Sequence, residues 1–218
     1  WMRQLEHLFK GSKKHIMGIN GGTNGNDVFD EYFKLKNLLY DYYKPQMVIL
    51  SINSSDITDI IYRGGQERFV SSSEVKYNEA PWWENIYSFS IISRNIIHNI
   101  FKIEWHYYTN EKFEEKKQEA LNLIDSCLTN QFIPLARGKK IKLLIVFSPR
   151  QYDLEENIMP FEKCKDQLTE HNIDIVDLFY SFKEQNRNYK DFFWQTDLHN
   201  NSKGYELWAK KIYERLNL

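Results

Sequence analysis

Two residues near the carboxyl terminus have the types and the spacing of a general-base pair. Asp197 and His199 lie two positions apart, ahead of a helix-like segment that contains Gly204. In extended backbone such residues project to the same side, so the carboxylate can orient the imidazole. An imidazole held in this way takes a proton from a serine hydroxyl and makes it a nucleophile toward esters. The alternative interpretation is that Asp197 caps a turn and His199 is polar surface; the helix that follows favours the pair.

Two further segments carry small or polar residues directly after apolar runs. Residues 20–27 contain three glycines within five positions, which is typical of a loop that turns sharply or approaches a ligand. Asp27, at the end of this loop, is a plausible N-cap for the next helix. Residues 51–59, after the second apolar run, are rich in serine, asparagine and aspartate. These two segments are candidates for the same site as Asp197 and His199.

The elements that must position these residues alternate in type along the chain. Apolar runs of strand length occupy 15–20, 47–52, 141–147 and 173–178, and helix-like segments occupy 2–10, 28–43, 111–132, 161–171 and 202–215. Continuous apolar strands separated by helices are typical of a parallel sheet with helices on both faces. Ligands bind beyond the carboxyl ends of such strands, where we expect the polar segments to meet. The sequence therefore predicts the α/β class.

Composition excludes several classes of partner. The 29 basic and 30 acidic residues are mixed along the chain, so no basic stripe indicates a nucleic-acid partner. Cys127 and Cys164 are too few for a disulfide framework or a zinc site, and we predict neither a metal nor a cofactor. No apolar run reaches the roughly 18 residues needed for a transmembrane segment. We interpret the chain as one domain, residues 1–218, with an aromatic-rich insertion or cap at about 63–108.

The order of these motifs resembles that of the SGNH/GDSL hydrolases, in particular the branch of carbohydrate O-acetylesterases and O-acetyltransferases. Residues 20–25 resemble the second of four family blocks, which makes Gly25 the oxyanion-hole glycine. Residues 48–59 resemble the third block, with Ser55 where the family has asparagine, so either Ser55 or Asn53 would be the second oxyanion donor. Asp197 and His199 resemble the last block. The strand end at 145–151 is also similar to this branch.

The first family block, Gly-Asp-Ser with the nucleophile, has no counterpart in the chain, and the resemblance covers about 1–62 and 139–218. The resemblance places this block just before the helix at 2–10, so we expect the serine upstream of Trp1. It also implies a flavodoxin-like three-layer α/β/α fold with a mostly parallel sheet that lacks its central first strand here. Ser51, Ser54, Ser55 and Ser148 lie near strand ends, but none lies in a Gly-x-Ser-x-Gly elbow.

The resemblance thus predicts a serine esterase that acts on acyl esters, with O-acetyl groups of carbohydrates as the expected class. The substrate would be a small acyl ester or an acylated glycan, and the compartment extracytoplasmic. Two alternatives stay open: an O-acetyltransferase of the same fold, and a catalytically inactive protein that binds a glycan or a protein partner. A flavodoxin-like nucleotide binder is a more distant alternative, because the chain has no phosphate-cradling glycine motif.

Overall fold

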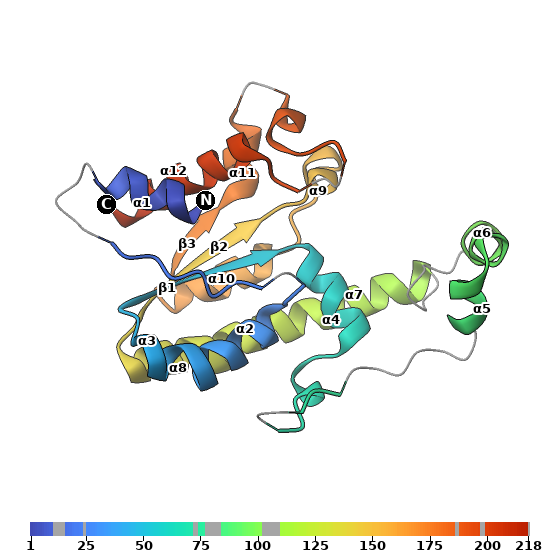
Figure 1. Cartoon of the computed structure of the whole chain (residues 1–218), viewed down its shortest axis with the longest axis horizontal. Coiled ribbons are helices and arrows are strands. Elements are labelled where there is room, and N and C mark those ends of the chain that lie inside the picture. Colours follow the sequence, from blue (N-terminus) through green and yellow to red (C-terminus); the bar gives the residue numbers. More distant parts are fainter. Residues whose placement is uncertain are drawn as a thin grey trace.

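The sheet is parallel and three-stranded in the computed structural model of this chain (Figure 1), which describes residues 1–10, 16–23, 25–71, 74–76, 84–101, 110–185, 188–196 and 199–217. Its order is β1 (Met47–Asn53), β2 (Lys142–Ser148) and β3 (Asp174–Asp177). Asn53 pairs with Ser148, and Phe147 with Asp177, so the three strands end at one edge. This confirms the predicted α/β class and the parallel pairing.

Helices cover both faces of the sheet, and β2 divides the core between them. Leu143, Ile145 and Phe147 face one apolar cluster, whereas Leu144 and Val146 face the other. The first cluster packs against α2 (Val28–Lys34), α4 (Ser55–Arg63), α7 (Asn110–Cys127), α8 (Ile133–Lys139) and α10 (Glu162–Glu170). The second packs against α1 (Met2–Lys10), α9 (Gln151–Glu155), α11 (Leu178–Lys183) and α12 (Ser202–Leu216). This is a three-layer α/β/α arrangement, consistent with a flavodoxin-like fold that lacks its first strand.

Two long helical runs each contain one widened turn. The run predicted at 28–43 consists of α2, a π-helical turn at Leu35–Leu39 and α3 (Tyr40–Tyr43). The run predicted at 111–132 continues instead to Lys139, because a second π-helical turn at Leu128–Phe132 leads directly into α8. Pro134 lies in the first turn of α8, directly after this widened turn, whose altered hydrogen-bond pattern accommodates a residue without an N–H.

The strand predicted at 15–20 is wrong over its described part, since residues 16–20 have no regular secondary structure. Among the described residues, β1 pairs with β2 alone, and the segment 16–23 forms no ladder with it. An extended run becomes a stable strand only when neighbouring backbone satisfies its N–H and C=O groups. Within the described part of the chain no strand pairs with this segment, so its apolar pattern does not produce a strand.

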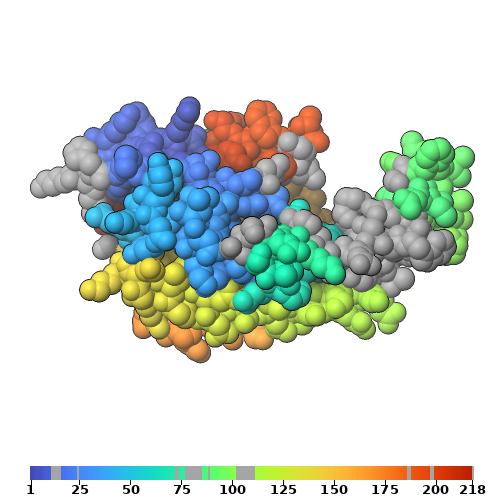
Figure 2. Space-filling view, turned by 60° about the horizontal axis from the view of Figure 1, so that its bottom comes forward, coloured from blue at the N-terminus to red at the C-terminus, as the bar shows by residue number. Residues whose placement is uncertain are grey.

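The region predicted as an insertion or cap contains two short helices, α5 (Glu84–Phe89) and α6 (Ile91–Asn99), which stand away from the body (Figures 1 and 2). Phe89 and Ile91 are 95% and 73% exposed. Residues 77–83 and 102–109 lie outside the described part, together with their tryptophans, so the role of this region stays a prediction. None of the helices described is long and apolar enough to cross a bilayer.

Candidate functional site

The glycine-rich turn, the end of β1 and the His199 loop all line one cavity of about 2200 Å³. Gly25, Asn53, Ser55 and His199 are among its lining residues, so the four candidates come from three distant parts of the chain to one space. The cavity also runs along the outer edge of β1, from Met47 to Ser51. Asp197 lies outside the described residues, and its pairing with His199 therefore stays a prediction.

Asn53 connects the end of β1 to the beginning of α4 through both parts of its amide. Its Oδ1 accepts the backbone N–H of Ser55 at 2.9 Å, and its Nδ2 donates to Ser148 Oγ at 3.4 Å. Its own N–H donates to Asp56 Oδ2 at 3.3 Å. Because the Ser55 N–H is already used, the hydroxyl is the donor that Ser55 offers to the cavity. The remaining N–H of the Asn53 amide is the competing donor.

Asp56 is a buried carboxyl group directly beneath this turn. Burial raises its pKa well above the usual value for aspartate, and the negative charge of Asp27 adds to the shift. The N–H of Asn53 opposes it, because it stabilises the ionised form. The net effect favours the protonated carboxyl, which reduces the negative charge on this wall of the cavity.

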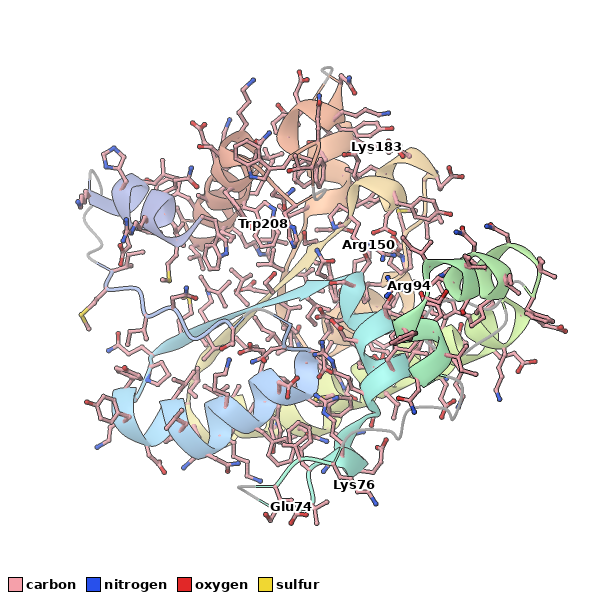
Figure 3. All side chains as sticks on the ribbon, turned by 45° about the vertical axis from the view of Figure 1, so that its right-hand side comes forward. Glu74, Lys76, Arg94, Arg150, Lys183 and Trp208 are labelled. Carbon is pink, nitrogen blue, oxygen red and sulfur yellow. The ribbon has the colours of Figure 1, made fainter. Side chains whose placement is uncertain are left out.

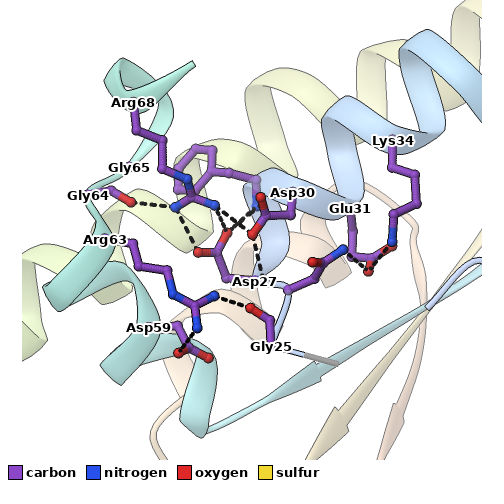
Figure 4. Close-up of polar contacts among 12 residues, drawn as sticks. Gly25, Asp27, Asp30, Glu31, Lys34, Asp59, Arg63, Gly64, Gly65 and Arg68 are labelled. Atoms are coloured by element: carbon purple, nitrogen blue, oxygen red, sulfur yellow. Dashed lines mark hydrogen bonds and ion pairs between the residues drawn. The ribbon is translucent and has the colours of Figure 1, made fainter. Parts of the chain in front are cut away.

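Gly25 adopts a left-handed backbone conformation, with φ of 76°, that a residue with a Cβ rarely adopts. The turn is closed by the N–H of Asn26, which donates to the Thr23 carbonyl at 3.3 Å. On its other side Arg63 donates to the Gly25 carbonyl and pairs with Asp59 at 3.1 Å (Figure 4). The glycine-rich turn is therefore connected to α4.

A buried ion pair fixes the end of the same turn. Both guanidinium Nη atoms of Arg68 bond the Asp27 carboxylate, at 2.7 and 2.8 Å, and one also reaches Asp30 at 2.7 Å (Figure 4). The side chains of Arg68 and Asp27 are 1% and 0% exposed. Asp27 also caps α2, as predicted, and forms a capping box with Asp30. Arg68 has no signal in the sequence, because no local pattern links residues 41 positions apart.

The loop before α12 holds His199 at the surface of the cavity. His199 is exposed, and its backbone carbonyl accepts the N–H of Trp194 at 2.7 Å. Asn201 caps α12 by accepting the N–H groups of Lys203 and Gly204, while its Nδ2 donates to the Asp191 carbonyl at 2.8 Å. The backbone from the His199 carbonyl to Asn201 is thus fixed by hydrogen bonds.

Arg150, which follows β2, lines the same cavity beside the carboxyl ends of β1 and β2 (Figure 3). Its Nε donates to Ser54 Oγ at 3.1 Å, and Ser54 Oγ donates to Asp153. Ser54 and Ser148 are only 2% and 1% exposed, which argues against either as a nucleophile. The resemblance included residue 150, but sequence reasoning gave it no role.

No protein-family model, no curated protein and no solved structure matches this chain. Within the described residues, no group of three or more histidine, cysteine, aspartate or glutamate side chains is arranged to hold a metal ion.

Proposed function

We propose that this chain forms most of an SGNH-type serine esterase that cleaves short acyl esters, with O-acetylated carbohydrates as the expected substrates. The observation that carries the proposal is the shared cavity: the base candidate His199 and the oxyanion-hole candidates Gly25, Ser55 and Asn53 all line it. His199 was selected from its spacing to Asp197, and Gly25, Ser55 and Asn53 were selected from the resemblance to the SGNH/GDSL hydrolases. Their meeting in one space beyond the strand ends is what the esterase arrangement requires.

In the proposed reaction a serine Oγ attacks the acyl carbonyl and transfers its proton to the imidazole of His199. The oxyanion that forms accepts hydrogen bonds from the Gly25 N–H and from Ser55 or Asn53, each worth about 2.7–4 kcal/mol of barrier. The C–O bond to the alcohol then breaks, and the leaving oxygen takes the proton from His199. Water repeats the sequence on the acyl-enzyme, releasing the acid and the serine. Asp197 would fix the histidine tautomer.

The cavity beside β1 supports a nucleophile that comes from outside residues 1–218. Among the described residues the outer edge of β1 has no strand partner, and α1 and the segment 16–23 line the same cavity. An added strand parallel to β1 would satisfy the backbone groups of that edge. Its carboxyl end would lie near Asn53, where a serine can approach His199.

The test is hydrolysis of p-nitrophenyl acetate and of acetylated sugars by the protein expressed from its complete reading frame. We expect His199→Ala to lower kcat/KM at least about 100-fold, because general-base catalysis contributes 10²–10⁴-fold. The matched control is His7→Ala, an exposed histidine on α1 that does not line the cavity. Equal rates for wild type and His199→Ala would contradict the proposal and favour an inactive binding protein. Acyl transfer to an added sugar, rather than to water, would identify a transferase.

A further inference from the structure

The positively charged side chain of Arg150 lines the cavity and contacts two buried polar residues, Ser54 and Asp153. Its side chain is 44% exposed, whereas the residues Ser54 and Asp153 beneath it are only 2% and 3% exposed. Asp153 Oδ2 accepts the backbone N–H of Arg150 at 2.7 Å and the hydroxyl of Ser54. Oδ2 of the buried carboxylate therefore has its hydrogen bonds without the guanidinium group, whose Nη2 forms an ion pair with Oδ1.

The guanidinium group is oriented but not saturated. Nε is held by Ser54 Oγ at 3.1 Å, and Nη2 lies 3.7 Å from Asp153 Oδ1, beyond hydrogen-bond range. Among the described residues, neither Nη atom of Arg150 makes a hydrogen bond, and the contact of Nη2 with Asp153 is a longer ion pair. A guanidinium with a fixed Nε and two Nη atoms free of hydrogen bonds has the fork that binds a planar oxyanion through two parallel bonds.

The acidic residues that line the cavity do not cancel this charge. Glu31 is paired with Lys34 at 3.1 Å, and Glu114 with Lys117 at 3.3 Å. The third, Asp56, is buried, and its raised pKa favours the neutral form. None of these three lining carboxyl groups pairs with Arg150, whose ion-pair partner among the described residues is Asp153, 3.7 Å away.

We propose that Arg150 binds an oxyanion, a carboxylate or a phosphate, carried by the ligand of this cavity. Combined with the proposed esterase function, on which this step rests, the preferred substrate is an acylated acidic sugar rather than a neutral one. Arg150 is then a specificity residue that holds the charged end of the substrate while His199 acts at the ester.

Binding tests the anion site without any catalysis. Calorimetric titration of the full protein at low salt compares methyl glucuronate, glucose 1-phosphate and methyl glucoside. We expect at least one anionic sugar to bind about 10-fold or more tightly than the glucoside, because hydrogen bonds to charged groups are stronger than those between neutral groups. The tighter of the two anions tells a carboxylate ligand from a phosphate ligand.

Three variants of matched design complete the binding test. Arg150→Gln should reduce the affinity for the anionic sugar to that for the glucoside, and Arg150→Lys should give an intermediate affinity because it keeps the charge but loses the fork. Arg137→Gln, a change on α8 outside the cavity, should leave the affinity unchanged. Equal anion affinities for wild type and Arg150→Gln, or no preference of the wild type for anions, would overturn the proposal.

A kinetic comparison separates this proposal from the esterase proposal. With acetylated glucuronate, Arg150→Gln should raise KM about 10-fold with little change in kcat; with the acetylated neutral sugar both constants should stay the same. If the wild type hydrolyses neither ester, the esterase proposal fails, whereas the titrations still decide whether Arg150 binds anions.

Discussion

Replacement of Arg68 by methionine tests the buried ion pair that connects the glycine-rich turn to the loop after α4. The change removes two bonds to Asp27, of 2.7 and 2.8 Å, one to Asp30 of 2.7 Å and one to the Gly64 carbonyl of 2.6 Å. It leaves the Asp27 carboxylate buried without its cation, and loss of one partner of a buried pair costs about 3–5 kcal/mol. The buried Nε of Arg68 has no partner among the described residues. Methionine also removes that unsatisfied donor, so we expect the lower end, about 3 kcal/mol.

Urea unfolding followed by far-UV circular dichroism measures this loss in a double-mutant cycle. Asp27→Asn removes the opposite charge but keeps a good N-cap for α2, so the double variant should be more stable than the sum of the single losses implies. We expect a coupling energy of at least about 1 kcal/mol. Arg137→Met, at an exposed position, should cost less than about 0.5 kcal/mol. A loss below about 1 kcal/mol for Arg68→Met, or additive single losses, would refute the reasoning.

Further predictions concern the stability of the fold. Because burial raises the pKa of Asp56, the folded state holds its proton above the unfolded pKa, so this group lowers stability as the pH rises from that value through the folded pKa. Asp56→Asn keeps the acceptor for the Asn53 N–H and should flatten this decline; identical urea midpoints against pH for both proteins would exclude it. A Cβ at Gly204 would lie 2.5 Å from the Phe192 carbonyl oxygen, so Gly204→Ala should cost about 1–3 kcal/mol in thermal unfolding. Gly138→Ala, with no atom within 4 Å of the added Cβ, should instead stabilise the helix by about 0.5–1 kcal/mol; equal shifts would show that packing at Gly204 is not the cause.

The fold was predictable where a pattern is long and local. The helical run at 28–43 was located by its periodicity and by Asp27, and the continuous apolar runs indicated parallel, buried strands. The segment 15–20 was predicted wrongly because strand formation depends on a neighbour that the pattern of one segment cannot show. The extension of the α7 run to Lys139 was missed because a widened turn accommodates Pro134.

The candidate site was predictable only in its local parts. Gly25 was selected because its glycine-rich loop resembles the second SGNH/GDSL block, and His199 was selected through its spacing from Asp197. Arg68 and Arg150 carry no such signal, because their partners are 41 and 96 positions away in the sequence. Each arginine meets its partners only when the sheet brings them together. Long-range polar contacts of this kind therefore cannot be predicted from the local pattern of a single sequence.

The outer edge of β1 has no strand partner in the described part of the chain, and this has a thermodynamic consequence for any strand attached to the same polypeptide. A covalent tether gives such a strand an effective concentration in the millimolar range, so even a Kd of about 10 µM for the edge suffices to keep it in place nearly all the time. Occupancy at 100 times the Kd adds about 2.7 kcal/mol to the free energy of unfolding. Docking of a single strand would then increase the free energy of unfolding and complete the active site at the same time, and its release would reverse both.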